Sequence, residues 1–262
     1  MKINTTYKLL LLIPLFFFLY AVFSEKETKE TIILNSNTEL KNKSLYLADE
    51  TNLPLVIVGD TETNPRFTVS DVLVEGLTLD GNFKNQSHEI NGDKKDGIRN
   101  SGIVIRKAEN VIIRNCIIRH CRSAGIVIEK GSKNILIENC EIYYNYFDGI
   151  AGYDSSECVI RNCKINSNRA AALSFDLQFN DVTVRDCVFH HNSTAVFVRD
   201  CKNLSFGRIK MLDNRRYGWY IIQRDEFAET TPENVTFFEV EDDSPDTLIN
   251  IKKNTNDKRG GY

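Results

Sequence analysis

The sequence predicts an all-β protein, a single-stranded parallel β-helix with about 23 residues in each rung and three short strands per rung. Two observations lead to this prediction. Cys116, Cys140, Cys163 and Cys187 stand 24, 23 and 24 residues apart in closely related contexts, the first of which is RNCIIRH. Between them, apolar residues alternate over short runs that are separated by turn residues, which is the periodicity of strands. A fixed period of this length is typical of a solenoid.

Five rungs align almost without gaps, and they begin at Gly102, Gly125, Gly149, Ala172 and Ala195. A leucine-rich repeat has a similar length, but the helical arc of that repeat has no counterpart in these rungs. Each strand is therefore expected to pair with the same strand one turn away, so that rungs stack about 4.8 Å apart. The right-handed sense of the coil is implied by other β-helices with this unit length and is not proved by the spacing.

The repeated cysteines share their column with Leu77 and Ile209, which makes this column a set of packing positions. We therefore expect buried free thiols that act as small apolar fillers. No CxxC or His-paired spacing occurs, so the sequence predicts no metal site. A disulfide between adjacent rungs is open as an alternative but is not implied.

A second column is polar and lies five residues after the cysteines. It consists of Asn82, Asn145, Asn168, Asn192 and Asn214, and Cys121 takes the place in one rung. Stacked amides can form hydrogen bonds along the axis, as they do in cross-β stacks. We interpret these asparagines as structural, and Asn192-Ser193-Thr194 is therefore not expected to be a glycosylation site.

The ends of the chain differ from the repeats. Lys2 and Lys8 accompany an apolar run over 9–23, which predicts a secretory signal peptide over 1–24 or an N-terminal anchor. Residues 25–54 are expected to form a cap or irregular first rungs, 55–253 the β-helix, and 254–262 a polar tail. The expected location is secreted, periplasmic or cell-surface, with no membrane contact beyond the anchor.

Composition limits the classes of partner. The chain has 262 residues, a net charge of −3, 42% hydrophobic and 26% charged residues. These values favour one globular domain, which we expect to be a monomer. No block rich in Lys and Arg is present, so a nucleic-acid partner is not expected.

The outer face of one strand is the best candidate for a functional surface. Two insertions, 83–101 and 223–233, adjoin the strand that begins GIVI in the repeats, each in its own rung, and long turns frame grooves in such coils. By alternation, one column on this face points outward. It comprises Arg106, Glu129, Tyr153, Asp176 and Arg199, with Lys130 and Asp154 beside it at the turn. Val104 and Phe197 are expected on the same face.

The stretch GLTLDGNFKNQS at 76–87, followed by KKDGI at 94–98, resembles the catalytic modules of mannuronan (alginate) C5-epimerases. More broadly, the chain resembles the pectin-lyase-like superfamily. The resemblance implies a β-helix that acts on an acidic polysaccharide, with Lys94 reaching the substrate groove and Asp96 beside it. The Asp-Pro-His motif of these epimerases has no counterpart, since Val127, Ile128 and Glu129 occupy the matching positions.

Lyases and epimerases both remove the proton at C5 of a uronate. The sugar carboxylate must first be neutralised, a role open to Arg106, Lys94 or Arg199. Tyr153 is the candidate base, with Glu129 and Asp176 on adjacent rungs.

Three alternatives stay open. Glu129 and Asp176 lie two rungs apart, about 9–10 Å, which would suit inverting hydrolysis. Asp154 and Asp176 could assist pectate lysis by holding Ca²⁺, the one cofactor considered. The third alternative is a non-catalytic glycan-binding or structural surface module. In the enzyme readings, the candidate substrate-binding residues are Lys94, Asp96, Lys130, Asp154 and Arg199.

Overall fold

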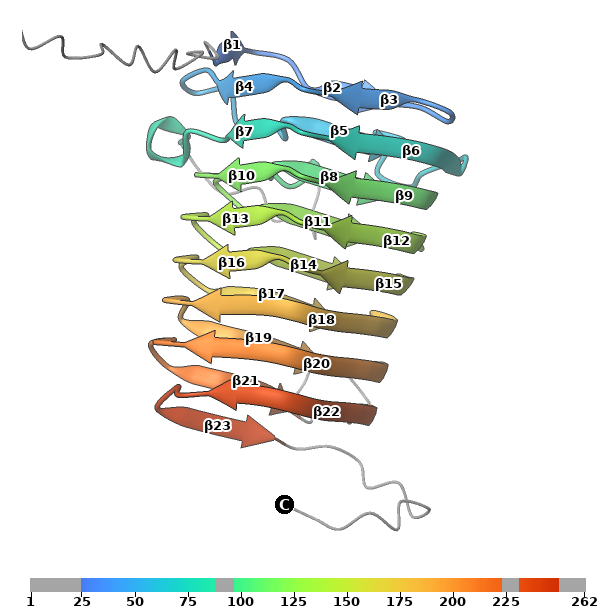
Figure 1. Ribbon diagram of the computed structural model, residues 1–262. Coiled ribbons are helices and arrows are strands. Elements are labelled where there is room, and N and C mark those ends of the chain that lie inside the picture. Colours follow the sequence, from blue (N-terminus) through green and yellow to red (C-terminus); the bar gives the residue numbers. More distant parts are fainter. Residues whose placement is uncertain (1–24, 88–96, 223–230, 250–262) are drawn as a thin grey trace, which may run out of the picture.

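The computed structural model describes residues 25–87, 97–222 and 231–249, and in this part of the chain it contains 23 strands and one short 3₁₀ turn. The strands wind into one coil whose rungs stack from β1 at one end to β23 at the other (Figure 1). All pairings between rungs are parallel. The predicted fold class is therefore confirmed. The predicted signal peptide and polar tail lie outside the described residues.

One wall of the coil is a nine-stranded sheet, called sheet B, whose strands follow chain order. Its strands are β2 (Ile32–Leu34), β5 (Val56–Gly59), β8 (Ile103–Arg106), β11 (Ile126–Glu129), β14 (Ile150–Tyr153), β17 (Ala171–Asp176), β19 (Thr194–Arg199), β21 (Tyr217–Ile222) and β23 (Asp246–Ile249). The pairing of β2 with β5 shows that the coil already stacks in register before residue 55.

The remaining walls belong to a 14-stranded sheet, called sheet A, which has two rows. The first row holds β3 (Glu39–Lys41), β6 (Val69–Glu75), β9 (Ala108–Arg114), β12 (Lys133–Glu138) and β15 (Ser156–Arg161). The second holds β1 (Lys26–Thr28), β4 (Ser44–Leu47), β7 (Thr78–Asp80), β10 (Ile117–Arg119), β13 (Glu141–Tyr143) and β16 (Lys164–Asn166), and the 3₁₀ turn Phe83–Asn85 follows β7.

The two rows merge in the last rungs, where β18 (Asn180–His190), β20 (Lys202–Leu212) and β22 (Glu233–Asp242) are continuous. Three strands per rung thus describes the central rungs, and the later rungs have two. The chain bends between the two rows both in the central rungs and in the later ones, because the residue immediately before each column cysteine adopts a left-handed conformation. Asn115, Asn139 and Asn162 do so with φ between 53° and 56°, and Asp186 follows with φ 58°. Asn and Asp tolerate this conformation better than other side chains.

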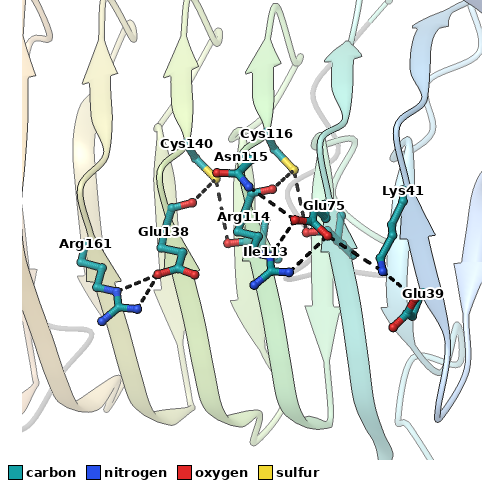
Figure 2. Close-up of polar contacts among 11 residues, drawn as sticks. Glu39, Lys41, Glu75, Ile113, Arg114, Asn115, Cys116, Glu138, Cys140 and Arg161 are labelled. Carbon is teal, nitrogen blue, oxygen red and sulfur yellow. Dashed lines mark hydrogen bonds and ion pairs between the residues drawn. The ribbon is translucent and has the colours of Figure 1, made fainter.

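The cysteine column lies inside the coil as predicted. The four thiols are about 1% exposed, and Cys187 pairs in register with Ile209. Each Sγ also donates to the carbonyl oxygen two residues earlier, for example from Cys116 to Arg114 over 3.2 Å (Figure 2). All seven cysteines are free and buried. Burial raises the pKa of Cys158 well above its usual value, which keeps this thiol in its unreactive form.

The asparagine column forms the predicted ladder. Asn145 donates through Nδ2 to Asn168 Oδ1 over 2.9 Å, and Asn168 donates in the same way to Asn192 over 3.0 Å. The bond from Asn192 to Asn214 measures 3.2 Å. Each acceptor oxygen also receives the backbone N–H of the preceding rung. Because Asn168 and Asn192 are fully buried, the Asn192 sequon is inaccessible in the folded coil.

Charged side chains alternate along the outer face of the first row of sheet A (Figure 2). Arg114 Nε donates to Glu75 Oε1 over 2.9 Å, and Arg161 Nε donates to Glu138 Oε2 over 2.8 Å. The hydrogen bond from Arg114 stabilises the charged form of the Glu75 carboxylate and holds its pKa below the usual value. These charges on the wall therefore largely neutralise one another. In the described residues, no helix is long and apolar enough to span a bilayer.

Candidate functional site

A shallow groove of about 630 Å³ lies on the outer face of sheet B, over β14, β17 and β19. Its walls come from the strands and from the turns that precede them. The lining residues are Arg99, Phe147, Asp148, Tyr153, Ala170, Ala171, Ser174, Asp176, Leu177, Ser193, Thr194, Phe197 and Arg199. The groove therefore combines aromatic, charged and small polar side chains.

The strand register brings three of the sequence-predicted residues together in this groove. Tyr153 pairs with Asp176 on the next rung, and Asp176 forms an ion pair with Arg199 one rung further. Arg199 Nε lies 2.9 Å from Asp176 Oδ1, and its second nitrogen contacts the other carboxylate oxygen. The pairing orients the guanidinium along the face of the sheet, where it can also meet a ligand.

An aromatic surface lies beside this ion pair. Phe197 stacks on Tyr220 of the next rung, with ring centroids 5.8 Å apart and an interplanar angle of 24°. Tyr217 contacts Tyr220 at 4.6 Å. On the opposite wall, the ring of Phe147 is 40% exposed. The groove thus has flat apolar surfaces next to a charged pair.

Part of the long insertion folds over the outer face of sheet B. The Arg99 guanidinium carbon lies 4.7 Å from the centre of the Tyr153 ring. Ile98 packs on an outer cluster formed by Ile57, Val104, Ala124, Val127 and Ala151. Ser123 N–H donates to Asn100 O over 3.2 Å, which ties the segment to the neighbouring turn.

This outer cluster corrects the expectation that Val104 lines the groove. Val104 and Val127 are fully buried, although they point away from the interior of the coil. The physical reason is the cover that Ile98 and Tyr153 contribute. Apolar residues on an outward face indicate a covering segment, and this signal was available in the sequence.

Arg106 and Glu129 stand in the predicted column but do not line the groove. Arg106 Nε lies 2.7 Å from Glu129 Oε1, both side chains are almost fully buried, and Arg106 also donates to the carbonyl oxygen of Asp60 over 3.1 Å. Glu129 and Asp176 each hold an arginine, so neither carboxylate is an unoccupied acid or base.

The remaining candidate residues lie at the edge of the sheet or outside the description. Lys130 and Asp154 occupy left-handed turn positions with φ 62° and 42°, outside the groove lining. Lys94 and Asp96 lie outside the described residues. Among those described, no three His, Cys, Asp or Glu side chains converge so as to hold a metal ion.

A second cleft of about 170 Å³ was not anticipated from the sequence. It is lined by Tyr46, Asp80, Asn82, Phe83, Lys84 and His120. Asp80 accepts from Arg119 Nε over 2.8 Å and lies 2.9 Å from His120 Nδ1. Although burial acts to raise it, these bonds hold the pKa of Asp80 below its usual value. These lining residues come from three rungs, so predicting the cleft from the sequence would have required the correct register of all three.

Comparison with known proteins places the fold. The family model described as "Right handed beta helix region" matches residues 79–237. The chain belongs to this family. No curated protein sequence matches the chain.

Three solved structures illustrate how far the likeness extends. The N-terminal fragment of gene product 12 of bacteriophage phi29 has 22% identity and a TM-score of 0.62, over 82% of this chain and 40% of that one. PfbA, a surface adhesin of Streptococcus pneumoniae, has 14% identity and a TM-score of 0.50, over 86% and 71%. The A-module of a mannuronan C-5 epimerase from Azotobacter vinelandii has 13% identity and a TM-score of 0.38, over 86% of each chain.

These identities show the fold alone. The likeness to the epimerase module is too weak to assign its reaction, and the chain spans 32% and 40% of the two structures of phi29 gene product 12 that it matches. Polysaccharide-processing enzymes, phage proteins and an adhesin all share this coil. The function must therefore be argued from the groove itself.

Proposed function

We propose that the protein binds a saccharide chain in the groove on sheet B, as an exported glycan-binding β-helix. The observation that carries this proposal is the Phe197–Tyr220 stack beside the Asp176–Arg199 ion pair. Sugar rings present C–H faces that pack on aromatic rings, and hydroxyl groups that exchange hydrogen bonds with charged side chains. The predicted signal peptide over 1–24 accounts for export.

The shape of the groove suits a polymer. Its lining runs across successive rungs, and strands β14 to β19 span about 10 Å at the rung spacing of a β-sheet. PfbA, which shares the fold, is a surface adhesin, and this agrees with a binding role.

The test is binding on a glycan array, followed by calorimetry with the best oligosaccharide. Phe197→Ala removes one ring of the stack, and the affinity should fall about twofold to twelvefold, since an aromatic contact is worth about 0.5–1.5 kcal/mol. Phe67→Ala is the matched control, because Phe67 is exposed and lies outside the groove lining. Equal affinities for the two variants, or no saccharide bound at all, would refute the proposal.

A second candidate function is removal of the C5 proton of a uronate, as in a lyase or an epimerase. The specific observation is Tyr153, which lies between the Arg99 guanidinium and the Asp176–Arg199 pair. Arg199 would neutralise the sugar carboxylate, and Tyr153 would take the C5 proton. In a lyase the C4–O bond then breaks, a C4=C5 double bond forms and the chain beyond C4 leaves.

Turnover distinguishes this candidate from binding. Alginate, pectate and glycosaminoglycans would be tested by the absorbance of the unsaturated product and by exchange of the C5 proton with solvent. If Tyr153 is the base, Tyr153→Phe should lose about 10²–10⁴ in rate with an unchanged melting temperature. Saccharide binding without turnover by the wild type would leave the binding proposal standing and exclude the enzyme.

A further inference from the structure

A second surface lies on the turn that leads from the second row of sheet A into sheet B. One residue of each rung projects here, and it directly follows the asparagine ladder. The column comprises Phe83, Arg122, Tyr146, Arg169, Ser193 and Arg215. Backbone hydrogen bonds stack it along the axis, from Tyr146 N–H to Cys121 O over 2.9 Å and from Arg169 N–H to Asn145 O over 3.1 Å. We call Arg122, Tyr146, Arg169 and Arg215 the arginine ridge.

The ridge is organised around one aromatic ring. The guanidinium carbon of Arg122 lies 3.9 Å from the centre of the Tyr146 ring, and that of Arg169 lies 4.5 Å from it. Arg215 Nη2 donates to Asn168 O over 3.4 Å. Stacking on a ring holds a guanidinium in place and leaves its N–H edges free to donate.

The ridge arginines lack the acidic partners that arginines elsewhere on the coil possess. Arg106, Arg114, Arg161, Arg199 and Arg208 each pair with a carboxylate of a neighbouring rung. In the described part of the chain, by contrast, no carboxylate lies within ion-pair distance of the three ridge arginines. Nε of Arg122 is moreover buried without a hydrogen-bond partner. A chain with a net charge of −3 thus gathers unmatched cations on one turn.

We propose that the arginine ridge binds an acidic polysaccharide lying along the coil axis. The backbones of Arg122, Arg169 and Arg215 follow one another at intervals of two rungs, about 10 Å. The guanidinium groups of Arg122 and Arg169 lie closer together than this, because both stack on the Tyr146 ring. Guanidinium groups donate to carboxylate or sulfate oxygens in a bidentate geometry, and these are the anionic groups of acidic glycans. A regularly charged polymer can meet all three arginines at once.

The ridge adjoins the groove of the proposed function, and the choice of a glycan rests in part on that function. Phe147 and Ala170, the residues that follow Tyr146 and Arg169, line the groove. Single-stranded nucleic acid is the competing polyanion, but its binding relies on aromatic faces on which bases stack. Two guanidinium groups already stack on the Tyr146 ring, which favours the glycan.

The test compares two double variants that carry the same change in net charge. Arg122→Gln/Arg169→Gln alters the ridge, whereas Arg161→Gln/Arg208→Gln alters arginines on the ion-paired wall. Affinities for alginate, dextran sulfate, neutral dextran and single-stranded DNA would be measured by calorimetry at 50 mM and 200 mM salt. The melting temperature of each variant confirms folding.

We expect both acidic glycans to bind and neutral dextran not to bind at the ridge. The ridge variant should lose roughly 100-fold in affinity, about tenfold for each charge-assisted contact. The control variant should lose less than about threefold. The relative affinities of alginate and dextran sulfate distinguish carboxylate from sulfate recognition.

Equal losses in the two variants would overturn the proposal, because the effect would then be one of net charge alone. Tighter binding of single-stranded DNA than of either acidic glycan would overturn the class of partner. Phe197→Ala separates the ridge from the groove: if the groove proposal fails, this variant and the wild type bind acidic glycans equally, while the ridge variant still loses affinity.

Discussion

The asparagine ladder offers a quantitative prediction about stability. Asn168→Ala removes an amide that accepts from Asn145 N–H over 3.1 Å and from Asn145 Nδ2 over 2.9 Å. The same amide donates to Asn192 Oδ1 over 3.0 Å and to Ile142 O over 3.4 Å. Two buried donors lose their acceptor, and each such loss costs about 1–3 kcal/mol. A water in the vacated space offsets part of this, so we expect the free energy of unfolding to fall by about 3 kcal/mol.

The control is Asn166→Ala, which makes the same chemical change on the same rung. Asn166 is half-buried at the end of β16, and it makes no side-chain hydrogen bond to another described residue. Its loss should change the free energy of unfolding by less than about 0.5 kcal/mol. For a chain of this size, 3 kcal/mol lowers the melting temperature by about 6–12 °C, which circular dichroism resolves easily.

Asn168→Asp adds a test by pH. The carboxylate would be buried among backbone groups, so its pKa in the folded state should be raised. A raised carboxyl pKa means that the folded state binds the proton more tightly, and the variant should regain stability relative to the wild type as the pH falls from 7 to about 4. If Asn168→Ala and Asn166→Ala melted within 2 °C of each other, the ladder would not be a stabilising network and our reasoning would be wrong.

Three further predictions concern the coil. Gly152→Ala would place a methyl group 2.4 Å from the Phe179 ring, so stability should fall by about 1–3 kcal/mol in urea denaturation and recover in part when Phe179→Leu is added. Cys163→Ser should cost roughly 1–3 kcal/mol by placing a hydroxyl in the core, without altering ligand affinity; an unchanged urea midpoint would contradict this. The depressed pKa of Asp80 supplies stability that is present above the unfolded pKa of about 4 and lost as the pH falls through the folded pKa. As the pH falls from roughly 5 to 2, the free energy of unfolding of Asp80→Asn should therefore decrease less than that of the wild type. Equal decreases in the two proteins would contradict this prediction.

The repeat made most of the fold predictable. A side chain that recurs every 23 or 24 residues has the same neighbours in each rung, so one correct alignment fixes the columns of Cys140 and Asn168 together. The sequence did not predict that β18 is one continuous strand, because the left-handed bend at Asp186 is compatible with one strand or with two. Sequence alternation specifies which face a residue takes, and it says little about where a strand is interrupted.

The site was predictable only in part. Alternation placed Tyr153, Asp176 and Arg199 on one stripe, and the register confirms that they adjoin. It could not show that Arg106 and Glu129 would bury each other, because an outward position was equated with exposure. The cover over Val104 comes from Ile98, just before β8 in the chain, and from Tyr153, two rungs further on. Alternation alone does not specify that these side chains fold over the outward face.

The turn after the second row of sheet A links stability to recognition. The ladder amide fixes the backbone of each rung, the next residue projects on the ridge, and the one after that lines the groove, as Asn145, Tyr146 and Phe147 show. Because the ladder amide holds the rungs in register through its hydrogen bonds, the side chains at the two following positions can vary without disturbing that register. Ala170 follows Phe147 at the same groove position one rung on, and its N–H donates to the Phe147 carbonyl oxygen over 3.0 Å. If the ridge and the groove bind glycans as proposed, specificity can therefore change by single substitutions at these two positions, whereas an inserted residue would move ridge and groove together.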